Sequence, residues 1–543
     1  MKKIANLSIL MSCIWLASCG GGGSATGVTS TSAEVQKVND KIILVLQPSI
    51  EQLAWIASAT GELKTERIKQ VQADLMQPLS EAKLREIAAA ARRKVIDYAP
   101  FALGGRVLAF DHNLSDAEMN QALLNIKNQV SGVKEVEADQ LINTASVAPE
   151  EITTVNQFQW YLYNTVQINT SSNPFILPLP PFYGSGFFNG TTKSFVNSTG
   201  DGVTIAVLDT GYVPHPDFTS NLQELDNQGN YGYTFLEDCY TAGECPADTP
   251  IEQRYLAPHA NALETGVNTN KAYEPANWHG SHVTGLIIAQ GLADAGDVAY
   301  GPILGGAPSA KVVPVRVLGK NGSYLSDVMN GMLWAANLYP TITNPNPAQI
   351  LNLSLTFSGT CSTMMQQIVD EIHTQNISIV AAAGNNGGVN IANKSPVSCS
   401  NVISVASVTP SRTVSAFSNI GNVTIAAPGG ALTIYTDPKT GKSVTGYASL
   451  ISTTYVGTEY GKCTAGAKCF NYTPMAGTSQ ATPLVSAALA DILALHPNLT
   501  TTQLTEIITN SADPLEYGST SLDGAGTLNV ANALELANDP KYN

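Results

Sequence analysis

The sequence predicts an α/β protein in which a small α/β unit precedes a larger domain, built on a parallel sheet with helices on both faces. Before residue 145, short apolar strand patterns alternate with helix patterns. From residue 203 onward, apolar segments typical of buried strands alternate with helical patterns, which indicates a parallel sheet covered on both sides. With 543 residues, 44% of them apolar and only 13% charged, the chain can bury a sizeable core.

The first 18 residues have the features of an export signal. Lys2 and Lys3 precede an apolar stretch too short to span a bilayer, and small residues follow it. Residues 16–19 resemble the lipobox of bacterial lipoproteins, which implies lipid on Cys19 and a flexible linker over 19–34. By the same resemblance Gly20 favours the outer membrane, and the alternative is an ordinary signal peptide.

The small unit is assigned to residues 35–145. Its predicted strands are 41–47, 106–110 and 133–139, and its predicted helices are 79–93 and 115–130. Ser115 followed by Glu118 is a capping box, in which each side chain satisfies a backbone amide at the start of the second helix.

Two segments of the larger domain carry reactive side chains at the edges of regular elements. TIAVLDTG is a buried strand pattern that ends at Asp209, and Gly211 permits the sharp turn after it. WHGSHVTGLIIA places His279 at the start of an apolar helix, with Gly280 allowing close approach.

Two further segments complete the set. GTSQATP places Ser479 at the start of a small-residue helix, where backbone amides and the positive end of the helix dipole stabilise an oxyanion. ISIVAAAGNNG ends a buried strand near Asn385, whose carboxamide is a second oxyanion donor. In chain order, Asp209, His279 and Ser479 form a triad in which the acid orients the imidazole and the imidazole takes the serine proton.

These four segments resemble the catalytic motifs of the subtilisin-like serine peptidases, the subtilases. VLDTG, HGSHVTG, AAAGN and GTSQATP occur in the order of that family, and the likeness extends from about residue 150 to the C-terminus. The resemblance implies a catalytic domain over 150–543 and hydrolysis of peptide bonds in proteins, with no cofactor for catalysis. It also implies that residues 35–145 are a propeptide that assists folding and inhibits the enzyme, with processing in 143–150.

The resemblance also implies where an extended substrate binds. The matching segments are NGSYL, with Gly322 and Tyr324, and LSLTF, with Ser354 and Leu355. This chain has Thr356 and Phe357 where the family usually has two glycines beside the primary specificity pocket. Bulk at these two positions either narrows the pocket or accompanies a shifted loop. In the other alternative Phe357 turns into the core, since aromatic side chains are usually buried.

Other readings of these motifs are weaker. VLDTG is also the signature of aspartic peptidases, but the chain lacks the second DTG or DSG that supplies the other carboxylate. His279 and His282 are spaced like a metal pair, yet no HExxH motif is present, so zinc is not expected and His282 is interpreted as a packing residue. Asp217, Asp294 and Asp297 could supply oxygen ligands to a structural calcium ion, against the plainer alternative of solvated loop aspartates.

Six of the eight cysteines follow the leader, and an even number in an exported protein favours disulfides. Six cysteines allow fifteen connectivities. We expect each cysteine to pair with the next one along the chain, because two of the resulting loops are short. Cys361 and Cys399 flank the Asn385 segment, as a cysteine pair does in some secreted subtilases. The expected pairs are Cys239–Cys245, Cys361–Cys399 and Cys463–Cys469.

Charge and context limit the partners. The first 149 residues carry 15 basic and 15 acidic side chains, so the net charge of −15 falls on the remainder, and nucleic acid is not an expected partner. Expected partners are protein substrates and the chain's own propeptide, with membrane contact only through a lipid anchor. The competing hypotheses are a catalytically silent binding protein with this fold and a processing enzyme with one substrate.

Overall fold

The computed structural model describes residues 40–142, 159–163, 165–166, 182–188, 195–226, 228–246, 248–264, 278–292, 303–436, 443–447, 449–455, 469–516 and 524–542. The export signal, the linker, Cys19 and the processing region 143–150 lie outside these residues and stay predictions. Among the residues described, no helix combines the length and apolar character needed to cross a membrane.

The N-terminal unit, residues 40–142, contains a four-stranded sheet in the order β2-β3-β1-β4. Its strands are β1 (Lys41–Leu46), β2 (Val95–Phe101), β3 (Gly105–Phe110) and β4 (Val133–Ala138). The β1/β3, β1/β4 and β2/β3 pairs are antiparallel. The three predicted strands are present, whereas β2 was not predicted.

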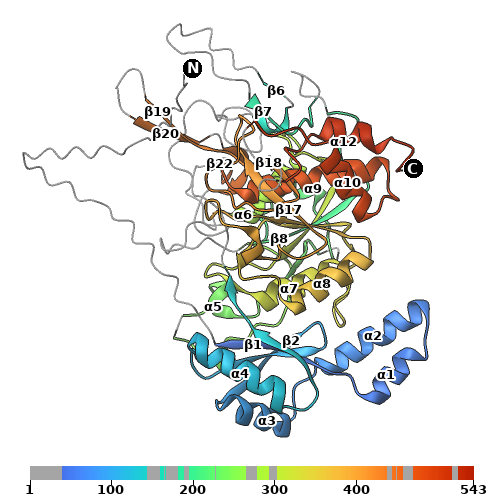
Figure 1. The fold of residues 1–543 in the computed structure, drawn as a ribbon, viewed down its shortest axis with the longest axis vertical. Coiled ribbons are helices and arrows are strands. Elements are labelled where there is room, and N and C mark those ends of the chain that lie inside the picture. The colour runs from blue at the N-terminus through green and yellow to red at the C-terminus, as the bar shows by residue number, and fades with distance from the viewer. Residues whose placement is uncertain are drawn as a thin grey trace, which may run out of the picture. The chain divides into compact units, whose positions relative to one another are not determined.

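Helices α3 (Glu81–Ala91) and α4 (Asp116–Gln129) cover one face of this sheet (Figure 1). The predicted capping box is present, because the Ser115 side chain accepts from the Glu118 amide and the Glu118 carboxylate accepts from the Ser115 amide. The opposite face contributes Ile43, Phe101 and Val107 to a core shared with the larger domain.

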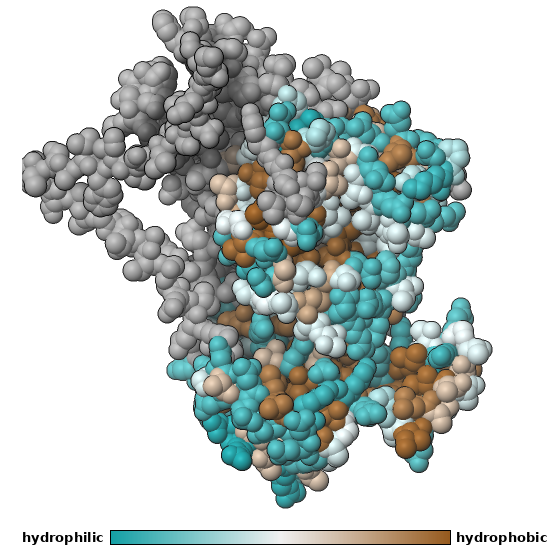
Figure 2. Space-filling view, viewed as in Figure 1, coloured by the Kyte–Doolittle hydropathy of each residue, from teal (hydrophilic) through white to brown (hydrophobic). Residues whose placement is uncertain are grey.

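A helical hairpin that was not predicted projects from the N-terminal unit. It consists of α1 (Ile50–Ala57) and α2 (Gly61–Leu75). Five large apolar side chains are exposed along it: Ile50, Leu53, Trp55, Leu63 and Ile68. Figure 2 shows hydrophobic surface on the part of the molecule that carries the hairpin. No residue of α1 and only Val71 of α2 is buried, so packing in a core does not define these two helices.

The larger domain is built on an eight-stranded sheet in the order β10-β9-β11-β8-β13-β15-β17-β18. The pairs from β9 to β18 are parallel, and β10 is antiparallel to β9. The strands are β8 (Thr204–Asp209), β9 (Tyr233–Thr234), β10 (His259–Ala260), β11 (Lys311–Arg316), β13 (Ile350–Leu353), β15 (Ser378–Ala382), β17 (Val402–Val408) and β18 (Ile425–Pro428).

Helices cover both faces of this sheet, as predicted. On one face lie α6 (His279–Ile288), α9 (Thr478–Leu495), α10 (Thr501–Asn510) and α12 (Val530–Ala537), and on the other lie α7 (Leu325–Ala335) and α8 (Thr363–Thr374) (Figure 1). Alternate residues of β8 enter the two cores: Ile205 and Val207 face α6 and α9, while Ala206 and Leu208 face α7 and α8. A strand buried on both faces needs the continuous apolar run that its sequence has.

Short elements complete the fold. The remaining strand pairs are β5 (Leu141–Ile142) with β12 (Ser323–Tyr324), β6 (Thr165–Val166) with β7 (Phe182–Tyr183), β14 (Phe357–Ser358) with β16 (Lys394–Ser395), β19 (Leu432–Thr436) with β20 (Ser443–Tyr447), and β21 (Leu450–Tyr455) with β22 (Phe470–Met475). Helix α5 is Cys239–Ala242, and 3₁₀ turns span Trp160–Leu162, Thr219–Asn221, Ile251–Gln253 and Ile391–Asn393.

Two of the predicted disulfides are present, Cys239–Cys245 and Cys361–Cys399. Cys469 is also disulfide-bonded, and its predicted partner Cys463 lies outside the described residues. The cysteines of the first bridge are separated by 6 positions in the sequence, and those of the second bridge are separated by 38. A longer loop loses more entropy in the unfolded chain when it is closed.

We therefore expect the second bridge to stabilise the fold more than the first. In a Ser479→Ala background, which prevents self-digestion, replacing Cys361 and Cys399 by Ala should lower the free energy of unfolding by about 4 kcal/mol. The matched replacement of Cys239 and Cys245 should lower it by about 2 kcal/mol. Denaturant unfolding of both variants checks the order, and a larger loss from the shorter loop would contradict it.

Candidate active site

Three adjacent strands end beside one another and carry three of the predicted site residues. In the sheet, β13 lies between β8 and β15. Asp209 is the last residue of β8, Ser354 directly follows β13, and Asn385 lies shortly beyond β15. Because carboxyl ends of parallel strands share one edge, the sheet gathers these side chains where ligands bind in folds of this kind.

Two glycines allow the helix that carries His279 to approach this edge. A Cβ atom on Gly280 would lie 2.2 Å from the Gly211 carbonyl oxygen, and a Cβ on Gly211 would lie 2.2 Å from the Ala262 carbonyl oxygen. Gly211 also has a φ of +103°, which side chains rarely adopt. Both glycines are thus required by backbone packing, as their sequence positions predicted.

Asp209 and His279 form a buried hydrogen-bonded pair. The His279 Nδ1 atom lies 2.8 Å from Asp209 Oδ1 and 2.9 Å from Oδ2, and neither side chain is exposed. Because a carboxylate accepts only, Nδ1 carries the proton and donates it, which leaves the lone pair on Nε2. Within the described residues, Nε2 has no hydrogen-bond partner. The imidazole is thus in the tautomer of a general base.

His282 is placed differently. Its Nε2 atom lies 3.0 Å from the Thr473 carbonyl oxygen and 3.2 Å from that of Leu450, and therefore donates to them. Burial, with a smaller effect of His279, lowers the pKa of His282 to about 3. A neutral imidazole that joins α6 to β21 and β22 agrees with the interpretation of His282 as a packing residue.

Ser479 is buried in the first turn of α9, and α9 packs against α6. Its hydroxyl donates to the Ser354 carbonyl at 2.9 Å, and the Ser354 hydroxyl donates to the Ser479 carbonyl at 2.9 Å. The hydroxyl makes no hydrogen bond to His279, since the His279 Nε2 atom lacks a partner among the described residues. The hydroxyl is instead directed toward the strand segment that was predicted to bind substrate.

Asn385 is held in a fixed orientation by Thr478, which sequence reasoning missed. The Asn385 Oδ1 atom accepts from the Thr478 amide at 3.0 Å and from the Thr478 hydroxyl at 2.9 Å. The same hydroxyl accepts from the Gly384 amide at 3.0 Å. With Oδ1 turned toward Thr478, the amino group of the carboxamide points the other way. The only sequence signal for this role was the position of Thr478 directly before Ser479.

Glu264 is a second residue that no motif indicated. It is buried, and its Oε2 atom accepts from the Thr210 hydroxyl at 2.8 Å, which in turn accepts from the Gly280 amide at 2.9 Å. Burial raises the pKa of Glu264 well above its usual range. The chain of contacts joins the residue after Asp209 to the residue after His279, so it helps to set their separation.

The two predicted substrate segments lie at the same edge. Gly322 precedes β12, and β12 pairs antiparallel with β5 of the N-terminal unit, with Ser323 opposite Ile142 and Tyr324 opposite Leu141. The segment predicted to add a substrate strand thus already carries a strand from the same chain. The pairing continues through a hydrogen bond from the Leu325 amide to the Gln140 carbonyl at 2.9 Å.

The residues after Ser354 resolve one open alternative. Leu355 and Phe357 are buried and belong to the core that contains α7 and α8, so Phe357 turns inward. Thr356 donates its hydroxyl to the Ser395 carbonyl at 3.1 Å. Its methyl carbon lies 2.6 Å from the position a Cβ on Gly384 would take, so it covers the glycine next to Asn385.

The surroundings of Asp217 do not fit a calcium site. Its Oδ1 atom accepts from the Leu292 amide at 2.8 Å, and its Oδ2 atom accepts from the Tyr472 hydroxyl at 3.1 Å. Calcium requires several oxygen ligands, and here hydrogen-bond donors face the carboxylate. No group of three or more His, Cys, Asp or Glu that could hold a metal occurs in the described residues, and Asp294 and Asp297 lie outside them.

Comparison with known proteins agrees with this site. A sequence model described as the subtilase family matches residues 200–530, which include the four motif segments. The chain belongs to the subtilase family. The expected α/β fold with a parallel sheet covered on both faces is thereby confirmed.

Individual relatives cover different shares of the chain. An extracellular protease of Xanthomonas campestris pv. campestris is 29% identical over 443 residues, which are 80% of this chain and 65% of that protein. An extracellular basic protease of Dichelobacter nodosus is 34% identical over 57% of this chain and 46% of that protein. The chain thus spans less than two thirds of the length of each of these two relatives.

Solved structures give the same result for the fold. A protease from Pseudoalteromonas arctica PAMC 21717 superposes with a TM-score of 0.51 at 30% identity, over 63% of this chain and 91% of that one. Fervidolysin from Fervidobacterium pennivorans superposes with a TM-score of 0.55 at 19% identity, over 92% of this chain and 61% of that one. The second likeness extends the shared fold over nearly the whole subtilase chain.

The contact between Gly280 and Gly211 generates a stability prediction. Gly280→Ala places a methyl group 2.2 Å from a backbone oxygen that cannot rotate away, so we expect a loss of about 1–3 kcal/mol or more in the free energy of unfolding. The control is Thr284→Val on the same helix, because the buried Thr284 hydroxyl has no partner within the described residues and its removal should be neutral or stabilising. Thermal unfolding of both variants in the Ser479→Ala background measures the difference; equal behaviour would count against the packing role of Gly280.

Proposed function

We propose that this subtilase is an exported serine endopeptidase, made as a zymogen, that hydrolyses peptide bonds in proteins. The observation that carries the proposal is the buried Asp209–His279 pair, with the His279 Nε2 lone pair left without a partner within the described residues. A buried polar atom without a partner costs free energy, and such costs are tolerated at functional sites. Proton acceptance from a nucleophile is the chemistry that this atom can perform.

Substrate binding would prepare Ser479 for attack. The Ser479 hydroxyl donates to the Ser354 carbonyl, which is the acceptor that an added peptide strand would use. When a substrate N–H donates to that carbonyl, it competes with the serine hydroxyl for the acceptor, and rotation about the Cα–Cβ bond turns the hydroxyl toward His279. Occupation of the substrate strand and activation of the nucleophile are in this way coupled.

The reaction then follows acyl transfer. The Ser479 oxygen attacks the scissile carbonyl carbon while its proton passes to His279 Nε2, and Asp209 stabilises the resulting imidazolium through Nδ1–H. The negative oxygen of the tetrahedral adduct accepts from the Asn385 amino group and from the backbone amide of Ser479. His279 protonates the leaving amine, and a water molecule, deprotonated by His279, hydrolyses the acyl enzyme.

The N-terminal unit, residues 35–145, acts as the inhibitor of its own enzyme. Support comes from β5, which occupies the edge of β12 where a substrate strand would pair. Processing within 143–150 would then follow directly on a segment already aligned like a substrate. Tyr324 contributes to this contact through its backbone pairing and its side chain.

Substrate range is set in part by Thr356. Its methyl group covers Gly384 beside Asn385, and we propose that it narrows the space for the substrate side chain before the scissile bond. We therefore favour small side chains at that substrate position. The structural calcium ion is not part of this proposal and stays a prediction, because the contacts of Asp217 do not favour it.

Export rests on the leader and on relatives that are named as extracellular proteases. The anchor at Cys19 would hold the precursor in the cell envelope, and cleavage near residue 145 would release the catalytic domain unless the two parts stay associated. The competing idea of a silent binding protein is disfavoured by the intact Asp209–His279 pair.

Covalent labelling tests the function directly. A biotinylated fluorophosphonate should label the processed wild-type protein at Ser479, as located by peptide mass spectrometry, and should not label Ser479→Ala. Casein hydrolysis should fall in that variant by about 10⁶-fold. Labelling at another serine, or full hydrolysis by Ser479→Ala, would reject the proposal.

The orientation of Asn385 generates a second activity prediction. Thr478→Val removes the hydroxyl that fixes Oδ1, so we expect kcat to fall by about 10 to 10²-fold with little change in KM, somewhat less than the loss from removing an oxyanion donor. Thr482→Val is the matched control one turn later, because its hydroxyl donates to the Thr478 carbonyl within the helix. Steady-state hydrolysis of a peptide anilide compares the two, and an equal fall in both would remove the assigned role of Thr478.

A further inference from the structure

Six carboxyl groups gather where the N-terminal unit contacts the catalytic domain. The N-terminal unit supplies Asp40, Glu137 and Asp139, and the catalytic domain supplies Glu237, Asp238 and Asp327. All except the half-buried Glu137 are at most 7% exposed. Such a concentration of buried acids is costly unless cations or protons neutralise it.

One buried cation lies in this cluster, and it comes from the N-terminal unit. The Lys41 Nζ atom lies 2.6 Å from Asp238 Oδ2, with both side chains 1% exposed. The ammonium also lies 3.7 Å from the ring centroids of Tyr98 and of Tyr324, which belong to opposite sides of the contact. This ion pair neutralises Asp238, and among the described residues none of the other five carboxyls forms an ion pair.

The remaining acids are held by neutral donors. Asp139 accepts from the Ser326 amide at 2.9 Å and from its hydroxyl at 2.7 Å, at the N-terminus of α7. Asp327 Oδ2 accepts from the Tyr324 amide at 3.0 Å. Glu237 Oε1 accepts from Asn330 at 3.3 Å, while its Oε2 has no partner within the described residues.

We propose that the N-terminal unit docks with uptake of protons by this cluster, so that the inhibitory contact is tight in acid and opens as the pH rises through neutrality. The proposal rests on the inhibitory role given above to residues 35–145 and adds its regulation. The physical cause is geometric: docking removes water from acids that face one another across the contact, and undocking returns them to water.

Proton uptake on docking requires carboxyl pKa values that are higher in the docked state, and the pKa values of the five carboxyls without an ion pair are raised. Burial raises the pKa of Asp139 to about 6 and the pKa of Asp327 to about 7. Burial also raises the pKa of Glu137 to about 7, and that of Glu237 well above its usual range. The pKa of Asp40 is raised as well, again mainly by burial.

A carboxyl whose pKa is raised by docking stabilises the docked state fully below its free pKa, and that contribution is lost as the pH rises through the docked value. For Asp139, Asp327 and Glu137 the window runs from about pH 4, the usual carboxyl value, to about pH 7. For each carboxyl that takes up a proton on docking, the equilibrium constant for docking falls about tenfold per pH unit as the pH rises through this window.

The other titratable groups that face the cluster do not reverse the expected weakening of docking with rising pH. Burial acts to raise the pKa of Asp238, but Lys41 and hydrogen bonds outweigh it and lower that pKa, so Asp238 stays ionised throughout the window. The remaining titratable or charged groups facing these carboxyls are Lys41, Tyr98, Glu135, Arg254, Tyr255, Tyr324 and Tyr339. Burial raises the pKa values of the four tyrosines further above the window. The positive charges of Lys41 and Arg254 act to lower the pKa of Asp40 but do not outweigh burial, and the negative charge of Glu135 adds to the raised pKa of Glu137.

Two backbone amides report docking directly. The amides of Leu325 and Ser326 lie in the first turn of α7, where no intrahelical acceptor exists, and donate to Gln140 and Asp139 of the N-terminal unit. Their hydrogen exchange in full-length Ser479→Ala, which keeps the chain uncut, should therefore follow undocking. After correction for intrinsic rates, we expect their protection factors to fall at least about tenfold between pH 5 and pH 8.

Neutral isosteres test the cause. In the same background, the double variant Asp139→Asn, Asp327→Asn mimics the protonated acids, so the decrease in protection factors between pH 5 and pH 8 should become markedly smaller. The control variant Glu252→Gln, at an exposed position, should show the same decrease as the parent protein. Glu237→Gln is the second variant should the pair disturb folding, as judged by circular dichroism. Equal protection at pH 5 and pH 8, or an undiminished fall in correctly folded isosteres, would overturn the proposal. Because all of these variants lack Ser479, the hydrogen-exchange result does not depend on peptidase activity. Failure of the peptidase proposal would appear instead in the fluorophosphonate labelling of the wild-type protein.

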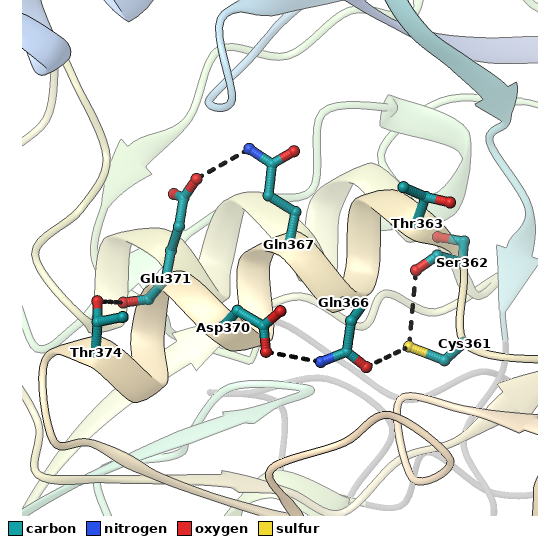
Figure 3. Close-up of a pocket in the computed structure, with 8 residues that line it drawn as sticks. All are labelled: Cys361, Ser362, Thr363, Gln366, Gln367, Asp370, Glu371 and Thr374. Carbon is teal, nitrogen blue, oxygen red and sulfur yellow. Dashed lines mark hydrogen bonds between the residues drawn. The ribbon is translucent and has the colours of Figure 1, made fainter.

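A surface pocket on α8 lies next to the contact between the N-terminal unit and the catalytic domain. It has a volume of about 620 Å³ and lies along the outer side of α8, where Gln366 pairs with Asp370 and Gln367 with Glu371 (Figure 3). Ser362, which lines the pocket, donates to Glu137 at 3.1 Å, so one of the linked acids lies one hydrogen bond away from the pocket.

Discussion

The close contact between the backbones at Gly211 and Gly280 is the constraint on which the site depends. It lets the first turn of α6 lie against the end of β8, with no side chain between the two. Only at that separation can His279 Nδ1 lie 2.8 Å from Asp209 Oδ1 while both remain buried. The Thr210 hydroxyl, held by Glu264, connects the same two elements, so backbone packing and buried polar contacts act together.

The other half of the site depends on α9 in the same way. This helix begins at Thr478 beneath the ends of β13 and β15, and its first residues bond with both strand ends. Ser354 and Asn385 are thereby bound to consecutive residues, Ser479 and Thr478. A helix N-terminus placed at the edge of a parallel sheet provides amides for a developing anion without further rearrangement. Preorganisation of this kind is typical of acyl-transfer sites.

The N-terminal unit uses the same sheet edge for a different purpose. Its last strand pairs with β12, and its buried sheet face completes the core around α7 and α8. A contact made of apolar packing alone would have no reason to depend on pH. The acids around Lys41 add that dependence, since burying several carboxyls beside one ammonium leaves negative charge that protons neutralise.

Much of this protein is determined by local sequence. Asp209, His279, Ser479 and Asn385 were predicted as site residues because strand and helix patterns place them at or near the ends of elements, and because their motifs resemble those of the subtilases. Short-range pairing likewise predicted Cys239–Cys245 and the Ser115 capping box. Tertiary structure alone decided that the Ser479 hydroxyl bonds to Ser354 instead of His279, that Phe357 turns inward, and that Glu264 and Thr478 support the site. The reason is physical: periodicity encodes which face of an element is buried, but a hydroxyl rotamer or a buried acid depends on neighbours far away in the chain.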